Sequence, residues 1–266
     1  MYHHLHLPKG WRHLALNETD SLMNLPIPEA GGAETAETLL VTAEFQTSGR
    51  GQRGTLWESN RSDNLLFSIA VRPDFLTADR QFLLSEAISL AIAETLAELV
   101  GNVTIKWPND IYVGDRKICG MLLEHRLCGR KISHSLIGVG LNVNQSHFRS
   151  DAPNPVSLRQ LLGRQTSREE LLGKIVDRFN QLLGLLQRGE MDLLHYAYCH
   201  RLYRRTERHF YSDGKEIFAA RIIDVEPQGR LLLRDDNGLV RSYAFKEVRF
   251  VLPTGPTTLP IRLKNG

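Results

Sequence analysis

Three glycines and two arginines alternate in a short run directly after a hydrophobic segment. Gly49, Arg50, Gly51, Arg53 and Gly54 make up this run. Glycine lets backbone N–H groups approach a ligand closely, and arginine offers a planar set of donors for phosphate or carboxylate. The run is not a P-loop, because no Gly-Lys-Ser/Thr follows, and its spacing misses the dinucleotide fingerprint. It therefore predicts an anion-binding loop of another kind.

Cationic, amide and carboxylate side chains recur at the ends of other predicted strands. Asp and Asn oxygens can hold Mg²⁺ directly or through water. The sequence shows no evident Ser/His/Asp set, no paired carboxylates and no thiolate nucleophile with a partner. Such a site suits charge stabilisation during phosphoryl transfer or adenylation, where positioning and electrostatics supply the catalysis. The set comprises Gln46, Arg50, Arg53, Lys106, Asn109, Asp110, Lys117 and Asn142.

The pattern of apolar residues predicts the elements that hold the glycine run. Residues 37–45 and the apolar run 65–71 read as strands on either side of it. Residues 11–24 read as a strand entering a helix, with Asp20 or Ser21 as its N-cap. A long helix follows from Thr77 to Gly101, and four runs at 103–107, 111–113, 118–124 and 132–144 predict an antiparallel meander. Residues 145–155 are expected to form a flap.

The rest of the chain predicts two more helices and a small β unit. Ser167 caps a helix that ends at Gly189, and another covers about 191–203. His195 and His200 on that helix are five residues apart, so a shared zinc face is not expected. From about Arg205, short runs with an Asn-Gly turn predict a small barrel. We therefore expect two domains, 1–205 and 206–266.

Composition limits the classes of protein. The 266 residues include 33 basic and 30 acidic side chains, a balance that does not require a nucleic-acid partner. Cys119, Cys128 and Cys199 form no CxxC pair and are odd in number, which argues against a disulfide framework or a thiolate zinc site. The N-terminus lacks an apolar signal region, and no segment approaches the ~18 apolar residues of a membrane span. We expect a cytoplasmic location.

Four separated motifs, in order, resemble the catalytic domain of biotin protein ligases over roughly residues 10–205. The resemblance implies an α+β fold: a mixed, largely antiparallel sheet flanked by helices, similar to class II aminoacyl-tRNA synthetases and to biotin and lipoate ligases. The terminal unit resembles the small C-terminal SH3-like β-barrel of these enzymes. No N-terminal helix-turn-helix is seen, so the monofunctional type without a DNA-binding domain is implied. The motifs are residues 49–54 with Trp57, residues 106–110, Lys117 with Gly120 and Glu124, and residues 138–144.

The resemblance implies a ligase that joins biotin to a lysine of a biotin carboxyl carrier domain of acetyl-CoA carboxylase or a related carboxylase. ATP and Mg²⁺ would serve the first step, which forms biotinyl-5′-AMP, and Lys117, Arg50 and Lys106 would be catalytic. By motif position, biotin would contact Ser21, Gln46, Arg50, Gln52, Lys117 and Gly120. ATP would contact Gly49, Arg50, Gly51, Arg53, Trp57, Lys117 and Asn142, and Mg²⁺ would contact Asp110 and Asn142.

Each single residue also has a structural alternative. Lys117 could be a solvated turn charge, Asp110 could stabilise its turn, and Trp57 or Trp107 could be core aromatics. Trp107 fits the structural role better. Lys106 could neutralise phosphate or orient the incoming lysine, and the sequence does not separate these roles.

The chain departs from the usual family pattern at four positions, and other functions compete. Leu22 and Met23 replace Thr-Asn, Gln52 replaces an arginine, and Lys246 replaces a glycine before Glu247. A lipoyl or octanoyl ligase or transferase of the same superfamily is the nearest alternative. A nucleic-acid-binding module is a distant one, in which the Gly-Arg run and the basic, tyrosine-rich helix bind phosphates and bases. An exposed edge strand could pair with a partner or form a homodimer.

Overall fold

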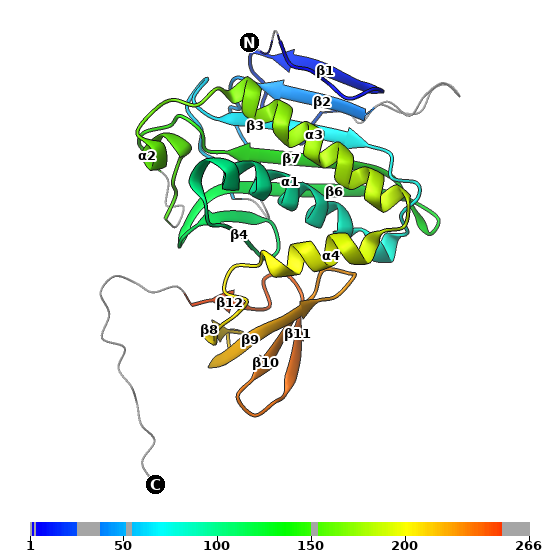
Figure 1. The fold of residues 1–266 in the computed structure, drawn as a ribbon, viewed down its shortest axis with the longest axis vertical. Coiled ribbons are helices and arrows are strands. Elements are labelled where there is room, and N and C mark those ends of the chain that lie inside the picture. The colour runs from blue at the N-terminus through cyan, green and yellow to red at the C-terminus, as the bar shows by residue number, and fades with distance from the viewer. Residues whose placement is uncertain (1, 3, 26–37, 52–54, 150–153, 252–266) are drawn as a thin grey trace.

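Two β-sheets with helices on one side of the larger sheet make up the protein (Figure 1). The computed structural model describes residues 2, 4–25, 38–51, 55–149 and 154–251. Within these residues, no helix combines the length and the apolar content that crossing a membrane requires.

The large sheet has seven strands in the order β1-β2-β3-β7-β6-β5-β4. Only β1 and β2 pair in parallel, and all other neighbours are antiparallel. The predicted mixed, largely antiparallel sheet is therefore confirmed, and so is the meander of its last four strands. The strands are β1 (Trp11–Leu16), β2 (Thr38–Ala43), β3 (Leu65–Val71), β4 (Val103–Lys106), β5 (Asp110–Val113), β6 (Arg116–Cys128) and β7 (Lys131–Leu141).

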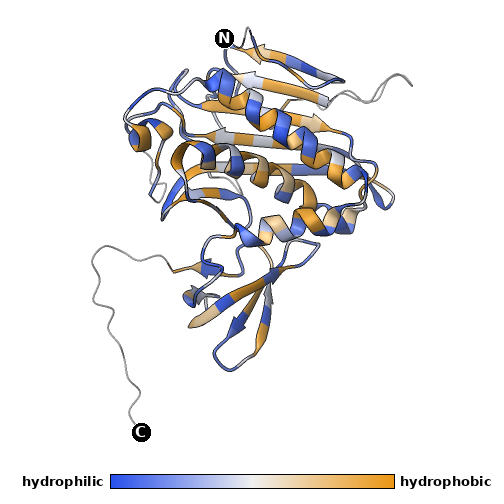
Figure 2. Cartoon of the chain, in the orientation of Figure 1, coloured by the Kyte–Doolittle hydropathy of each residue, from blue (hydrophilic) through white to orange (hydrophobic). Residues whose placement is uncertain are grey.

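Helices cover one face of this sheet (Figure 1). The expected long helices are present, and the first begins after a short 3₁₀ turn at Ala78–Arg80. Ser167 caps α3 by accepting a hydrogen bond from the backbone N–H of Glu170. Figure 2 shows α3 with alternating polar and apolar patches, and its apolar residues are buried against the core. The helices are α1 (Phe82–Val100), α2 (Leu158–Leu162), α3 (Arg168–Gln187) and α4 (Met191–His200).

Two small apolar clusters lie on the opposite face of the large sheet, in place of helices. Leu65, Phe67 and Ile69 of β3 join the main core with α1, whereas Leu66 and Ala70 join two small apolar clusters. This division follows from the alternation of side chains along a strand. The small clusters also contain Leu22 and Met23 from the segment after β1. The face away from the helices is therefore lined by the segment that was expected to bind a ligand.

One predicted element is wrong. Residues 17–25 contain no helix, so neither Asp20 nor Ser21 caps one. Asp20 instead accepts hydrogen bonds from the Ser21 N–H at 2.7 Å and from the Asn24 amide at 2.6 Å. Such local bonds from an aspartate compete with helix formation and hold a turn.

The small sheet is antiparallel, with five strands in the order β11-β10-β9-β8-β12. The predicted Asn-Gly hairpin joins β10 to β11, and Gly238 has φ = 81°, which suits glycine. Between residues 206 and 251, its edge strands β11 and β12 are not paired with each other. The strands are β8 (His209–Ser212), β9 (Ile217–Val225), β10 (Leu231–Asp235), β11 (Val240–Tyr243) and β12 (Arg249–Phe250).

Candidate active site

A floor of glycines lies on the open face of the large sheet. Gly120 of β6 is the register partner of Gly140 of β7, and Gly138 lies two residues before Gly140 on the same face. A Cβ atom on Gly140 would lie 2.3 Å from Cε2 of Trp57, and one on Gly138 would lie 2.4 Å from Sδ of Met23. Any side chain at these two positions would displace its neighbour, so the glycines allow the covering residues to lie directly on the backbone.

A bulge in β6 turns Lys117 toward this floor. Tyr112 of β5 pairs with Lys117 and Ile111 pairs with Cys119, so β6 carries one extra residue between these pairs. In a regular strand, Lys117 and Gly120 would point to opposite faces because they are three positions apart. The bulge puts both on the same face. The Lys117 Nζ would accordingly lie 3.1 Å from a Cβ on Gly120.

The Lys117 ammonium is held between a carboxylate and an aromatic ring. Its Nζ forms an ion pair with Oδ1 of Asp110 at 2.7 Å and lies 5.7 Å from the centre of the Trp57 ring. The side chains of Lys117 and Asp110 are 24% and 19% exposed, so the pair is partly shielded from water. A fixed, poorly hydrated ammonium interacts more strongly with a ligand anion than a solvated one.

The glycine run forms a narrow two-stranded arm beside Lys117. The Trp57 N–H donates to the Gly49 carbonyl at 2.9 Å, and the Gly51 N–H donates to the Thr55 carbonyl at 2.7 Å. This pairing brings Trp57 back over the glycine floor. Gln52, Arg53 and Gly54, which follow Gly51 in the chain, lie outside the described residues.

Arg50 extends from this arm to the far end of the same β6 face. Its guanidinium donates to Glu124 Oε1 at 2.8 Å and to Asn24 Oδ1 at 3.0 Å. Glu124 and Gly120 are four residues apart on β6 and therefore share a face. Two cations, Lys117 and Arg50, thus stand at opposite ends of a surface whose middle is glycine.

Ser21 and Gln46 form one wall of the site. Gln46 Oε1 accepts from the Leu22 N–H at 2.7 Å, and the buried Ser21 hydroxyl accepts from the Met23 N–H at 3.3 Å and the Arg50 N–H at 3.4 Å. The two side chains are therefore joined to the same turn.

Asn142 lies at the end of β7, where the chain leaves the glycine floor. Its amide Nδ2 donates to the Val156 carbonyl at 3.1 Å. Its Oδ1 is buried and has no hydrogen-bond partner within the described residues. The same loop is attached to Lys117, because the Lys117 N–H donates to the Asn154 carbonyl at 2.9 Å.

Lys106 points toward the small sheet. Its Nζ donates to the Tyr112 hydroxyl at 3.3 Å and lies 5.1 Å and 5.3 Å from the ring centres of Tyr112 and Phe250. Burial lowers the pKa of Lys106 below its ordinary value, although the nearby Asp110 carboxylate opposes this effect. Trp107 is structural, as expected: it is buried, and its indole N–H donates to the Gly229 carbonyl at 2.9 Å.

Known proteins match this chain in both sequence and fold. Residues 29–142 match the sequence model of the Biotin/lipoate A/B protein ligase family. A bifunctional ligase/repressor BirA of Bacillus subtilis is 30% identical over 177 residues, which cover 66% of this chain and 52% of that protein. A biotin–[acetyl-CoA-carboxylase] ligase of Paracoccus denitrificans is 26% identical over 232 residues, covering 84% of this chain and 94% of that protein. The chain belongs to the biotin protein ligase family. It spans about half the length of the Bacillus relative.

The fold of a solved biotin protein ligase agrees with this assignment. The Aquifex aeolicus enzyme, in complex with biotin and ATP, superposes with a TM-score of 0.71 at 23% identity, covering 90% of this chain and 99% of that one. At this identity the likeness shows the fold alone.

For a member of the biotin protein ligase family, the structure brings most of the predicted site residues together. Ser21, Gln46 and Arg50 are linked by hydrogen bonds around one turn. Lys117, Asp110 and Trp57 meet above Gly120. Lys106 lies nearer the small sheet, where Phe250 of β12 covers it. The predictions for Gln52 and Arg53 fall on undescribed residues.

Sequence reasoning missed the partners that hold these side chains. The sequence marks Glu124 only as part of a motif, whereas in the structure its carboxylate forms an ion pair with Arg50. A second set of contacts holds the loops next to the site. Arg168 forms an ion pair with Glu44 at 2.8 Å and donates to the Asn64 carbonyl. The Asn64 side chain in turn accepts from the Val143 N–H. The even spacing of Gly120 and Glu124 indicates that both lie on the same face of β6, so the sequence could have placed Glu124 at the site. Arg168 is too far from Glu44 in the sequence for this pair to be predicted.

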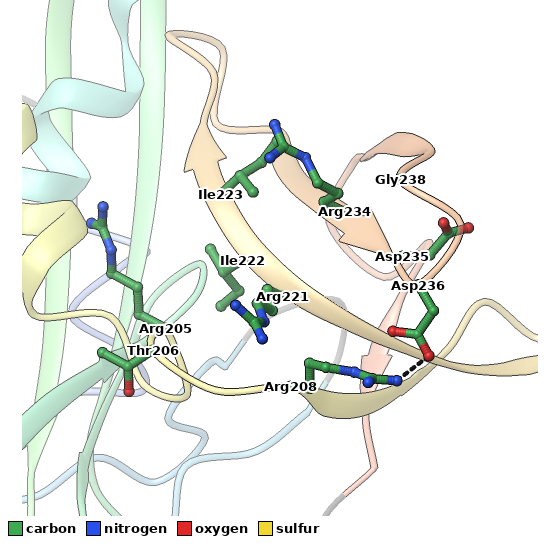
Figure 3. Close-up of a pocket in the computed structure, with 10 residues that line it drawn as sticks. All are labelled: Arg205, Thr206, Arg208, Arg221, Ile222, Ile223, Arg234, Asp235, Asp236 and Gly238. Atoms are coloured by element: carbon green, nitrogen blue, oxygen red, sulfur yellow. Dashed lines mark hydrogen bonds and ion pairs between the residues drawn. The ribbon is translucent and has the colours of Figure 1, made fainter.

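A surface hollow of about 620 Å³ lies away from this site, on the small sheet (Figure 3). Four arginines and two aspartates line it, and Arg208 forms an ion pair with Asp236. None of the predicted site residues borders it. The hollow is therefore separate from the glycine floor. Its arginines are Arg205, Arg208, Arg221 and Arg234.

Proposed function

We propose that the chain catalyses ATP-dependent biotinylation of a lysine on a biotin carboxyl carrier domain, through biotinyl-5′-AMP. Its relatives include proteins named as biotin–[acetyl-CoA-carboxylase] ligases, and the Aquifex enzyme of the same fold was solved with biotin and ATP. The observation that carries the proposal is the Lys117 ammonium, held by Asp110 above the Gly120–Gly140 pair.

In the first half-reaction, a carboxylate oxygen of biotin attacks the α-phosphorus of ATP, and the bond to pyrophosphate breaks. Negative charge moves from the carboxylate to the phosphoryl oxygens during this step. A compact ammonium such as that of Lys117 can stay close to that charge throughout. The glycine floor lets Trp57 and the Lys117 ammonium lie close to the backbone, and so fixes their positions beside the reacting groups.

Arg50 would bind the biotin carboxylate and the α-phosphate from the other end of the floor. Its present partners, Glu124 and Asn24, hold the guanidinium in place until the ligand anion competes for it. Ser21 and Gln46 would hydrogen-bond the fused rings of biotin. Leu22 and Met23 are buried and apolar, so they offer biotin no side-chain hydrogen bonds. The polar contacts must therefore come from Ser21, Gln46 and the adjacent backbone.

ATP would lie along the glycine arm, beside Gly49, Gly51 and Trp57, and by motif position it would also contact Arg53. Mg²⁺ would neutralise phosphate charge, and the available donors suit an ion held chiefly by phosphates. Asn142 offers a buried oxygen that has no partner among the described residues, and Asp110 offers a carboxylate.

In the second half-reaction, the carrier lysine amine attacks the acyl carbon, and the bond from that carbon to the AMP oxygen breaks. Lys106 lies between the large sheet and Phe250, where it could neutralise phosphate or orient the incoming lysine. We take residues 1–205 as the catalytic domain and 206–266 as a small SH3-like domain. The proposal includes a cytoplasmic location, which three free cysteines support. A homodimer through an edge strand stays a prediction, testable by mass in solution.

Incubation with labelled biotin, ATP and Mg²⁺ tests this function. We expect biotin-dependent pyrophosphate release, and label on a carrier domain whose target lysine is intact but not on one with Lys→Arg at that lysine. Parallel reactions replace biotin with lipoate or octanoate and measure binding of an oligonucleotide. Activation of lipoate or octanoate alone would favour the superfamily alternative. Salt-sensitive oligonucleotide binding without adenylate formation would favour the nucleic-acid alternative.

A further inference from the structure

A histidine, a cysteine and an aspartate meet where α4 contacts the small sheet. His195 and Cys199 are four residues apart on α4 and therefore share one face of the helix. Asp224 comes from β9, which lies next to α4 in Figure 1. The three ligand atoms, His195 Nε2, Cys199 Sγ and Asp224 Oδ1, all lie within 4.8 Å of one another.

The triangle of these atoms matches tetrahedral zinc closely. Zn–N, Zn–S and Zn–O bonds of ordinary length, at tetrahedral angles, separate the ligand atoms by about 3.4–3.6 Å. Here Sγ lies 3.5 Å from Nε2 and 3.3 Å from Oδ1, while Nε2 lies 2.9 Å from Oδ1. Only the His195–Asp224 edge must widen appreciably, by about 0.5 Å. Asp224 is half exposed on β9, and its Oδ1 also accepts from the Val225 N–H at 2.8 Å, so a small rotation of this side chain must supply the widening.

A buried carboxylate that contacts the other ring nitrogen of His195 also favours a metal site. Glu86 of α1 is 1% exposed, and its Oε1 lies 2.9 Å from His195 Nδ1. Without a metal, both ring nitrogens have a carboxylate oxygen at 2.9 Å, so Nδ1 donates to Glu86 and Nε2 donates to Asp224. Zinc would replace the Nε2 proton, while the Nδ1 proton would stay in the bond with Glu86. A carboxylate in this position is the usual orienting partner of a zinc-bound histidine. The other Glu86 oxygen, Oε2, is buried without a hydrogen-bond partner in the described part of the chain.

We propose that His195, Cys199 and Asp224 bind a Zn²⁺ ion, with Glu86 as the positioning residue and water as the fourth ligand. Cys199 is buried and Asp224 is half exposed, so the open coordination position would face solvent. The ion would fasten β9 of the small sheet to α4, and through Glu86 to α1. None of these residues belongs to the proposed ligase site, so this inference stands independently of the ligase activity.

Titration of the metal-stripped protein with Co²⁺ and then with Zn²⁺ tests the proposal. We expect one Co²⁺ per chain, a thiolate-to-cobalt charge-transfer band, and loss of that band when Zn²⁺ displaces the cobalt. Cys199→Ser should abolish the band, and Asp224→Asn should weaken binding at least about tenfold. Glu86→Gln should weaken it by about 10- to 100-fold, as other orienting partners do. Zinc should also raise the melting temperature of the wild type but not that of Cys199→Ser.

Two matched controls come from the same chain. Cys128 is an exposed free cysteine at the end of β6, and His200 is an exposed histidine on α4. Cys128→Ser and His200→Gln should keep the cobalt band unchanged. Circular dichroism of each metal-free variant establishes that it is folded. The proposal is overturned if the wild type binds no cobalt, if the band survives Cys199→Ser, or if it disappears in Cys128→Ser. Any of these results would leave the cluster as a metal-free ion pair, in which a charged His195 bridges Glu86 and Asp224.

Discussion

The indole ring of Trp57 lies directly on the backbone of Gly140. The two residues are far apart in sequence, and a Cβ at Gly140 would lie 2.3 Å from Cε2 and 2.5 Å from Nε1 of the ring. The hydrogen bonds of the glycine arm bring Trp57 to this place, and Lys117 lies over its ring. The position of the Lys117 ammonium therefore depends on a glycine in the next strand.

Gly140→Ala should accordingly damage the site. The methyl group must push Trp57 away, and such overpacking costs about 1–3 kcal/mol. We expect biotin-dependent pyrophosphate release to fall at least about tenfold, and tryptophan fluorescence to shift. Gly173→Ala is the matched control. Gly173 lies inside α3, and a Cβ atom there would contact only Leu5, at 3.8 Å. That change should leave activity intact and be neutral or slightly stabilising. Equal activity of the two variants would show that Trp57 does not need Gly140.

Lys246→Gly should stabilise the protein by about 1 kcal/mol. Lys246 has φ = 71°, a left-handed conformation that costs energy for any residue with a Cβ. Glycine adopts this conformation without strain, which gives a physical reason for the glycine in the family pattern at this position. The sequence alone did not explain the effect of Lys246. Urea unfolding measures the change. Lys215→Gly, at an exposed turn position without positive φ, should be neutral or destabilising. A loss of stability in Lys246→Gly would contradict the argument.

The Glu44–Arg168 ion pair should make stability fall in acid. Burial alone would raise the pKa of Glu44, but hydrogen bonds from Ser62 and Arg168 and the charge of Arg168 outweigh it, so the pKa is lowered. The stabilisation is therefore complete above the ordinary glutamate pKa of 4.5 and is lost as pH falls through the lower folded-state value. Glu44→Gln should cost about 2 kcal/mol at pH 7 and much less at pH 3.

Urea unfolding at both pH values measures this difference. The exposed Glu207 provides a control, since Glu207→Gln should change stability little at either pH. An equal cost of Glu44→Gln at pH 7 and pH 3 would rule out the ion pair as its source.

Trp107→Phe should loosen the small sheet without removing activity. It keeps an aromatic ring near Phe245 but removes the hydrogen bond to the partly buried Gly229 carbonyl, which costs about 1 kcal/mol. We expect a lower unfolding midpoint in urea and a nearly unchanged rate of pyrophosphate release per folded molecule. A large loss of rate with unchanged stability would instead give Trp107 a role in the reaction.

The sequence predicted the strands and the long helices because these depend on local patterns. Its motifs also pointed to Ser21, Gln46, Arg50 and Lys117, which the structure brings to one face of the large sheet. It failed where distant segments decide the outcome. The turn after β1 was predicted as a helix start, since Asp20 and Ser21 are common caps, but Asp20 binds Asn24 instead. The bulge that aims Lys117 depends on pairing with β5. The five-residue spacing of His195 and His200 argues against a shared zinc face, but the side chains that lie beside His195 are those of Cys199 and, from β9, Asp224.

The central claim is that the Lys117 ammonium stabilises charge as biotin is adenylated. Biotin-dependent pyrophosphate release by Lys117→Ala, compared with Arg116→Ala, tests it most directly. Arg116 is the exposed neighbour at the start of β6 and controls for the loss of one positive charge. We predict that Lys117→Ala abolishes release, with a folded circular dichroism spectrum, while Arg116→Ala stays within about threefold of wild type. Release by Lys117→Ala at the wild-type rate would contradict the account.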